Sequence, residues 1–347
     1  MQQRRCGNSD LRLSVLGLGC WEFGGGPYWG DHSQADADAI VRRAVDLGIT
    51  YFDTAEAYND GRSESSLGEA LQGVPRDKVV IGTKVAPSNC EPQTLVAHCE
   101  ASLQRLRTDT IDLYMVHWPI TPHSIAHFTK DPILPSVPDA FAALMKLQQQ
   151  GKVRHIGISN FGVSKMDEAL ATGVRLAVNQ LPYNLLARGI EREALPYCRR
   201  RGIGVVGYMA LMQGLLADIY RTLDDVPLWQ RRTRHFACSR ADELCRHGEP
   251  GAEAETNQAL AAVRAIAAGC GMTMPEVAIK WAMGGDGVTC VLAGSRSVAE
   301  LEANCRAAES PLDAAIVAEL TAATDPLLDT LGPSFDYYEN PRNDRTR

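Results

Sequence analysis

The sequence contains no long hydrophobic run, no CxxC pair and no excess of basic residues. A membrane-spanning helix needs roughly 18 or more consecutive apolar residues, and no stretch of this chain approaches that length. Its 35 lysines and arginines are outnumbered by 42 aspartates and glutamates, which gives a formal net charge of −7. Because nucleic-acid-binding proteins usually carry a basic surface, we expect neither nucleic acid nor a membrane as a partner.

The cysteines also exclude a disulfide framework as the basis of the fold. Ten are scattered along 347 residues, a length that can bury a large core without covalent staples. The N-terminal segment begins with Arg4 and Arg5, but Arg12 and two glycines interrupt the apolar stretch, and no signal-peptide cleavage pattern follows. We therefore expect buried, reduced thiols in a cytoplasmic protein.

Short apolar runs alternate with amphipathic segments along most of the chain. Eight runs are candidate strands: Val15–Gly19, Ile49–Asp53, Val79–Lys84, Ile111–His117, Val153–Ser159, Leu176–Gln180, Gly204–Tyr208 and Val288–Leu292. Strands this uniformly apolar are typical of a parallel sheet covered by helices. Eight such units over about 300 residues favour a closed (β/α)8 TIM barrel. We expect a single domain over residues 1–347, with a core at about 4–325 and a C-terminal tail at 326–347. An open, doubly wound sheet is the alternative.

Three segments depart from this repeating pattern. Arg5–Ser14 contains turn-forming residues and predicts a β-hairpin before the first barrel strand. Asp218–Gly251, after the seventh strand, is too long for a plain connection, so we expect it to be functional or to contain helix. Residues 202–207 spell GxGxxG, but they follow a helix and run into a strand, the reverse of a dinucleotide-binding fingerprint. We interpret Gly202 as a helix C-cap.

Polar residues end several of the predicted strands. Asp53 ends the second, Lys84 the third and His117 the fourth, and Tyr58 lies in the loop after Asp53. The strands of an α/β barrel carry the active site at their C-terminal ends, so we expect these four side chains to lie together. An ammonium about 4 Å from a phenolate stabilises that anion by roughly 4 kcal/mol at an effective dielectric of about 20. We therefore expect Lys84 to lower the pKa of Tyr58 towards neutrality, which suits general acid–base catalysis.

The other two residues complete a chemical set. Asp53 supplies the negative charge that a buried Lys84 requires, and His117 is left to hydrogen-bond a carbonyl oxygen. Such a set polarises a carbonyl and protonates the resulting alkoxide through Tyr58, but it contains no hydride source. A nicotinamide cofactor is therefore implied.

Several motifs resemble those of the aldo-keto reductase superfamily in order and spacing. They are Leu16–Trp21, Tyr51–Tyr58, Gly61–Glu64, Ile81–Lys84, Asp112–His117, Gly151–Asn160 and Val291–Arg296. The resemblance covers about residues 4–325. It implies a (β/α)8 barrel and an NAD(P)H-dependent oxidoreductase that reversibly reduces an aldehyde, ketone or sugar carbonyl to an alcohol. It also implies the same tetrad, with Tyr58 as general acid and base.

The resemblance further implies where the cofactor lies. Ser159, Asn160 and Gln180 match positions that bind the nicotinamide carboxamide, and Tyr208 matches the aromatic residue under the nicotinamide ring. Gly214 would let the backbone approach the pyrophosphate closely. The positions that match the adenosine-ribose end are Gly294, Ser295, Arg296 and Asn304.

The coenzyme preference depends on two residues with opposite effects. Glu300 stands where the family often has Gln or Arg, and a carboxylate there would repel a 2′-phosphate. Arg296 would attract the same phosphate through a charge-assisted contact. We expect a slight preference for NADP(H) over NAD(H).

Aromatic residues in the loops after the first and fourth strands are candidate substrate contacts. Trp21, Trp29 and Trp118 suit an apolar pocket or a stacked sugar or ring, with plain loop packing as the alternative. In the C-terminal tail, Phe335, Tyr337 and Tyr338 are placed to fold over the mouth of the barrel, whereas Asn340–Arg347 is expected to be frayed.

Two functions are alternatives to carbonyl reduction, and two further side-chain clusters are candidate binding sites. The rivals are an NAD-dependent aldose or alcohol dehydrogenase working oxidatively and a cofactor-binding regulatory subunit with negligible turnover; the complete tetrad argues against the latter. His117, His123 and His127 have no recognised metal-ligand spacing, so we expect no metal. The basic run 231–235 is interpreted as a solvated face or, alternatively, as a clamp on cofactor phosphates.

Overall fold

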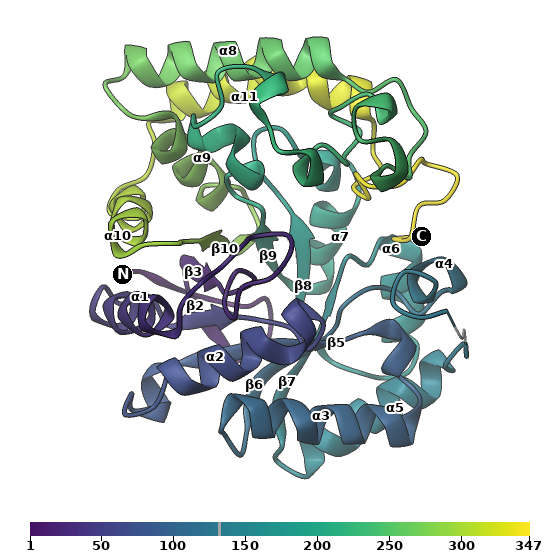
Figure 1. The fold of residues 1–347 in the computed structure, drawn as a ribbon. Helices are drawn as coiled ribbons and strands as arrows, with labels where there is room; N and C mark the ends of the chain where they lie inside the picture. The colour runs from purple at the N-terminus through teal and green to yellow at the C-terminus, as the bar shows by residue number, and fades with distance from the viewer. Residues whose placement is uncertain (131–132) are drawn as a thin grey trace.

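The computed structural model describes residues 1–130 and 133–347, and its centre is a closed barrel of eight parallel strands surrounded by helices (Figure 1). In order around the barrel, the strands are β10 (Val288–Gly294), β3 (Leu16–Gly19), β4 (Tyr51–Asp53), β5 (Val80–Val85), β6 (Ile111–Val116), β7 (Val153–Ser159), β8 (Leu176–Pro182) and β9 (Gly204–Tyr208). The barrel closes between β10 and β3, where Val291 lies opposite Leu16. This closure confirms the predicted fold and excludes the open sheet.

The predicted hairpin is present and covers one end of the barrel. β1 (Gln3–Arg5) and β2 (Arg12–Ser14) pair in antiparallel fashion. Leu13 packs among the side chains inside the barrel, and the hairpin bonds to Thr50 and Gly202, which precede β4 and β9. The hairpin therefore closes the end where strands begin and leaves the other end for the site.

Helices follow most of the strands and bury one apolar face each. They are α1 (Gln34–Asp46), α2 (Arg62–Ala70), α3 (Pro92–Leu106), α4 (Pro122–Ile125), α5 (Val137–Gln149), α6 (Val163–Leu170), α7 (Ala194–Arg201), α8 (Glu253–Gly269), α9 (Met274–Met283), α10 (Val298–Ala307) and α11 (Ala314–Leu331). In α1, the Ser33 side chain accepts a hydrogen bond from Asp36 N, and the buried face includes Ile40 and Ala44. No single helix in the described ranges is long and apolar enough to cross a membrane; the α8–α9 pair, bent by 97°, passes that test only by length and composition.

The segment after β9 contains short helices of its own, as expected. Between residues 218 and 251 the chain forms four 3₁₀ turns, η6 (Leu223–Asp225), η7 (Leu228–Gln230), η8 (Cys238–Arg240) and η9 (Asp242–Leu244). Gly202 caps α7 with φ of 67°, a left-handed conformation that glycine adopts without steric cost. The interpretation of the GxGxxG match as a helix end running into a strand is thus confirmed.

The cysteine prediction is wrong for one pair. Cys238 and Cys245 form a disulfide across η8 and η9, with Cα atoms 5.5 Å apart. They are brought together by the turns of this loop, which spacing alone did not reveal. The other eight cysteines are free, and all of them except the half-buried Cys270 are buried.

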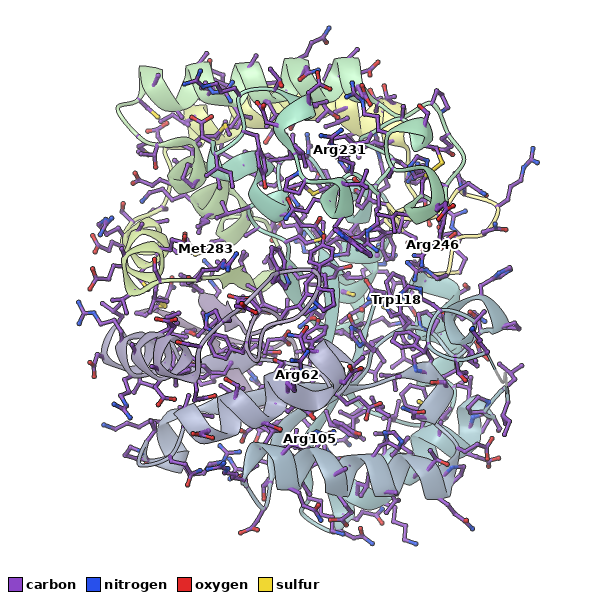
Figure 2. The ribbon with its side chains drawn as sticks, in the orientation of Figure 1. Arg62, Arg105, Trp118, Arg231, Arg246 and Met283 are labelled. Atoms are coloured by element: carbon purple, nitrogen blue, oxygen red, sulfur yellow. A yellow bond between two sulfur atoms is a disulfide. The ribbon has the colours of Figure 1, made fainter. Side chains whose placement is uncertain are left out.

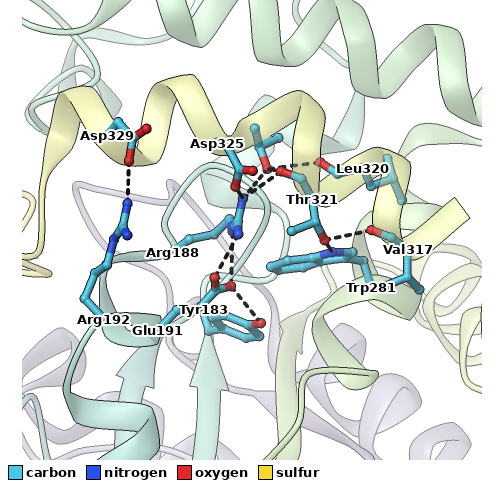
Figure 3. Close-up of polar contacts among 12 residues, drawn as sticks. Tyr183, Arg188, Glu191, Arg192, Trp281, Val317, Leu320, Thr321, Asp325 and Asp329 are labelled. Atoms are coloured by element: carbon cyan, nitrogen blue, oxygen red, sulfur yellow. Dashed lines mark hydrogen bonds and ion pairs between the residues drawn. The ribbon is translucent and has the colours of Figure 1, made fainter. Parts of the chain in front are cut away.

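Ion pairs anchor α11 to the segment after β8. The buried Arg188 guanidinium pairs with Glu191 and with Asp325 of α11, each at 2.8 Å (Figure 3). Trp281 Nε1 of α9 donates a hydrogen bond to Thr321 Oγ1 of α11 at 3.0 Å. α11 also packs along α8 (Figure 1). These contacts fix the helix from which the C-terminal tail departs.

The tail is packed rather than frayed. Arg345 forms a double hydrogen bond with Asp336, at 2.7 Å to each carboxylate oxygen, and their side chains are only 3% and 0% exposed. Gly162 N, at the start of α6, donates to Thr346 O at 2.8 Å, and the yellow C-terminus ends close to α6 in Figure 1. The tail thus crosses the barrel mouth, because its charged residues find partners there that the sequence pattern did not show.

Candidate active site

The structure brings the four predicted catalytic side chains together at the C-terminal ends of adjacent strands. Lys84 Nζ, on β5, donates to Asp53 Oδ1 at 2.7 Å and lies 3.3 Å from the Tyr58 hydroxyl. The Lys84 and Asp53 side chains are 0% and 4% exposed. The rings of Tyr58 and His117 meet edge to face, with centroids 5.5 Å apart. Neighbouring strands in the barrel supply these groups, so their proximity follows from strand order.

The direction of the Tyr58 pKa differs from the expectation. Burial raises the pKa of the Tyr58 phenol well above 10, and the negative charge of Asp53 adds to this effect. The predicted lowering by Lys84 is therefore wrong for this structure, because the ammonium charge is already compensated by Asp53. Burial also lowers the pKa of Lys84, although Asp53 opposes that change. Tyr58 is accordingly a protonated phenol at neutral pH.

His117 is held as a neutral imidazole. Burial lowers its pKa well below 6.5, and the positive charges of Lys84 and Arg345 act in the same direction. Its Nδ1 atom is buried and has no hydrogen-bond partner among residues 1–130 and 133–347. An unpartnered buried polar atom is costly, so this nitrogen is suited to a ligand.

The predicted nicotinamide-binding residues lie beside this group. Gln180 Nε2 donates to Asp53 Oδ2 at 2.7 Å, and Ser159 Oγ donates to the Gln180 carbonyl at 3.0 Å. The Tyr208 hydroxyl donates to Asn160 Oδ1 at 2.8 Å. These four side chains end β7, β8 and β9, so one polar network joins them to the tetrad.

The predicted adenosine-end residues gather at the junction of β10 and α10. Asn304 Nδ2 donates to Ser295 Oγ at 3.2 Å and to Gly294 O at 3.4 Å. Asn304 also lines a cavity of about 520 Å³ together with Asp218, Arg264, Met272 and Pro275. Gly214, with φ of 103°, lies in η5 (Met212–Ala217), which leads into the same cavity. The residues predicted for the adenosine end thus come from β10 and α10, whereas those predicted for the nicotinamide come from the C-terminal parts of β7, β8 and β9.

The aromatic residues divide into two groups. Trp21 stacks on Tyr58 with centroids 5.6 Å apart, and Trp29 meets Trp21 edge-on at 5.3 Å. Trp118 instead contacts the tail, because the Arg345 guanidinium lies 3.8 Å from the centroid of the Trp118 ring. Figure 2 labels Trp118 next to Arg246. Trp21 and Trp29 therefore face the tetrad, whereas Trp118 anchors the tail.

Residues 15–325 match the model of the Aldo/keto reductase family. The chain belongs to this family. The chain is 31% identical to the NADH-specific methylglyoxal reductase of Escherichia coli (strain K12), and the aligned region covers 94% of this chain and 100% of the relative. Aldo-keto reductase YhdN of Bacillus subtilis (strain 168) is 30% identical, over 96% and 97% of the two chains. The chain is an NAD(P)-dependent oxidoreductase of this family.

Solved structures of family members share the fold. Aldo-keto reductase AKR11C1 from Bacillus halodurans, in its holo form, has a TM-score of 0.71 and 25% identity, covering 94% of this chain and 96% of that one. An aldo/keto reductase from Klebsiella pneumoniae, solved with NADP and acetate, has a TM-score of 0.68 and 26% identity over 99% and 98%. A nicotinamide cofactor is thus bound by a close structural neighbour.

Unpartnered polar atoms in this aldo/keto reductase fit such a cofactor. Trp29 Nε1 and both ring nitrogens of His32 are buried without hydrogen-bond partners in the described part of the chain. Burial lowers the pKa of His32, and the Arg296 side chain donates a hydrogen bond to the carbonyl of the preceding residue, Asp31, at 3.3 Å. Phosphate oxygens and ribose hydroxyls would satisfy donors and acceptors of this kind. His32 was missed in the sequence because it does not end a strand.

A buried carboxylate, Glu22, was missed for the same reason. Its Oε1 accepts a hydrogen bond from Ser295 N at 2.9 Å, and burial raises its pKa to about 7. Nearby, Glu300 Oε2 accepts from Arg296 N at 2.8 Å, at the start of α10. The Arg296 side chain turns away and donates to Asp31 O at 3.3 Å. Two carboxylates therefore lie at the adenosine end of the site.

Proposed function

We propose that this aldo/keto reductase reduces the carbonyl group of a small aldehyde, ketone or sugar, with Tyr58 as the proton donor. The observation that carries the proposal is the buried, protonated Tyr58 hydroxyl 3.3 Å from Lys84 Nζ. The reduced nicotinamide, when bound, supplies the hydride. The names of two Escherichia coli relatives, both methylglyoxal reductases, support a small carbonyl compound as substrate.

Each member of the tetrad has a distinct role in this proposal. The neutral His117 ring donates a hydrogen bond to the carbonyl oxygen and orients it towards Tyr58. Tyr58 gives its proton to the alkoxide, and the Lys84 ammonium stabilises the phenolate that remains. Asp53 keeps Lys84 charged and in position. In the oxidative direction the same groups act in reverse, with the Tyr58 phenolate as base.

We propose NAD(H) as the preferred coenzyme, in place of the slight NADP(H) preference expected from the sequence. The Glu300 carboxylate accepts from the Arg296 backbone N–H, directly before the N-cap of α10, and so lies beside a helix N-terminus that could otherwise receive a phosphate. Glu22 adds a second carboxylate close by. A 2′-phosphate would be repelled by Glu300 and by the ionised form of Glu22, whose pKa is about 7, whereas ribose hydroxyls can donate hydrogen bonds to both. Fluorescence titration tests this proposal directly. NADH should bind more tightly than NADPH, and Glu300→Arg should reduce the difference between the two dissociation constants.

The decisive test of the chemistry is Tyr58→Phe, assayed on a panel of aldehydes, ketones and sugars with both coenzymes. Loss of a general acid should lower kcat/KM at least ~100-fold, while coenzyme binding stays unchanged. Equal activity of the variant and the wild type would refute the role of Tyr58. A wild type that binds coenzyme but reduces nothing in the panel would instead favour the regulatory-subunit hypothesis.

A further inference from the structure

One guanidinium beside the proposed active site has no acidic partner. Arg232, in the long segment after β9, donates from Nε to Trp229 O at 2.7 Å and forms no ion pair with any carboxylate of the described residues. Its neighbours in the basic run are used differently. Arg231 donates to the carbonyls of residues 224 and 226, and Arg234 donates to those of residues 331 and 334. Arg231 and Arg234 thus hold loops, whereas the Arg232 guanidinium lies beside the Tyr28 ring and hydroxyl and pairs with no carboxylate of the described residues.

Aromatic rings hold Arg232 in a fixed place. Its guanidinium carbon lies 5.2 Å from the Tyr28 ring centroid, 5.6 Å from that of Tyr338 and 5.9 Å from that of Trp229. Gln213 ties two of these rings together, because its Oε1 accepts from the Tyr28 hydroxyl and its Nε2 donates to the Tyr338 hydroxyl, each at 2.8 Å. Two segments distant in sequence, around Tyr28 and Tyr338, therefore converge on this arginine, which indicates a positioned side chain rather than a loose surface one.

The same rings lead from Arg232 to the reactive phenol. Tyr28 stacks on Trp21 at 4.8 Å between centroids, and Trp21 stacks on Tyr58 at 5.6 Å. The Tyr338 hydroxyl in turn lies 2.8 Å from Gln213 Nε2 and 3.9 Å from Met209 Sδ, next to Tyr208. Arg232 thus stands at one end of a series of stacked aromatic rings, and Tyr58 stands at the other end.

The neighbouring cationic side chains are already neutralised. Arg345 pairs with Asp336 at 2.7 Å, and Arg246, which Figure 2 labels, pairs with Glu339 at 2.7 Å. Arg232 contributes an uncompensated positive charge at the mouth of the site, although the chain as a whole has a formal charge of −7. A positive charge that the protein leaves unpaired beside a site attracts an anionic ligand.

We propose that Arg232 binds an anionic group, a carboxylate or a phosphate, at the end of the substrate remote from the carbonyl. The enzyme then prefers anionic aldehydes or ketones to neutral ones of the same size; this inference rests on the carbonyl reduction proposed above. The planar guanidinium presents paired N–H donors that match carboxylate or phosphate oxygens. The series of aromatic rings between Arg232 and Tyr58 accommodates the apolar or ring portion that separates the two groups.

Matched substrate pairs test the inference. 4-Formylbenzoate and 4-formylbenzamide differ only in charge and donor pattern, and glyceraldehyde 3-phosphate is compared with glyceraldehyde for the phosphate. We expect wild-type kcat/KM for the anionic member of a pair to exceed that for the neutral member by at least ~10-fold. Hydrogen bonds to charged groups typically change binding by about this factor or more. Arg232→Met should reduce that ratio to about 1 through KM, while the neutral substrate changes less than about 3-fold. Arg232→Lys should retain part of the preference.

The control variant is Arg221→Met, because Arg221 lies in the same segment but is exposed and contacts none of these rings in the described structure. It should leave the anionic preference intact. The inference is overturned if the wild type shows no anionic preference, or if Arg232→Met slows both substrates equally. It is also overturned if Arg232→Met weakens NADH binding by fluorescence titration, which would place Arg232 on the cofactor. If the wild type reduces neither member of either pair, the proposed function itself fails.

Discussion

The buried Glu22 carboxyl makes the stability of this protein depend on pH in a defined way. Burial raises its pKa from 4.5 to about 7 in the folded state, and its main contact is the hydrogen bond from Ser295 N. The folded protein therefore holds this proton more tightly than the unfolded chain. The resulting stabilisation is complete below about pH 4.5 and is lost as the pH rises through 7.

The size of the effect follows from the shift. A difference of about 2.5 pKa units, at 1.36 kcal/mol per unit, corresponds to about 3 kcal/mol at most. Glu22→Gln keeps an oxygen that accepts from Ser295 N but carries no charge at any pH, so it mimics the protonated carboxyl. We expect variant and wild type to have similar free energies of unfolding at pH 5. At pH 8 the variant should be more stable by about 3 kcal/mol or less.

Urea unfolding followed by tryptophan fluorescence at pH 5, 6, 7 and 8 measures this difference directly. Other groups that titrate in this range are shared by the two proteins and cancel in the comparison. Glu319→Gln, at an exposed position on α11, is the control and should show no pH-dependent difference. A Glu22→Gln variant that is no more stable than wild type at pH 8 would refute the reasoning.

Two further predictions concern buried ion pairs, in addition to the Tyr58→Phe test above. Lys84→Met leaves Asp53 buried without a counter-charge and should lower the free energy of unfolding by about 3–5 kcal/mol. Adding Asp53→Asn to this variant should restore much of the lost stability, measured by urea unfolding, but should restore no activity. Wild-type stability of the single variant would contradict the buried pair. Asp336→Asn leaves the Arg345 guanidinium with only the more distant Glu339 carboxylate, at 4.0 Å, and should loosen the C-terminal tail, detected as faster tryptic removal of its last residues than in wild type. Unchanged proteolysis would mean that other contacts hold the tail.

The barrel and the catalytic cluster could be predicted because both follow from local patterns. Each apolar run becomes a strand, and the parallel topology then places the residues that end β4, β5 and β6 side by side. Asp53, Lys84 and His117 therefore meet whatever the details of packing. Residues that do not end strands escaped this reasoning, as Glu22 and His32 show.

Protonation states and long-range pairings were decided only by the tertiary structure, because they depend on burial and on partners distant in the sequence. The order and ends of the strands are set by nearby residues, so the sequence by itself determined the fold and the identity of the candidate catalytic groups. The protonation of Tyr58 depends on how completely the surrounding chain excludes water. The pairing of Glu22 with Ser295, the closure of the tail through Asp336 and the unpaired state of Arg232 each join segments far apart in the chain. Local periodicity carries no information about such pairings, because desolvation and charge compensation arise only when the folded chain brings the partners into contact.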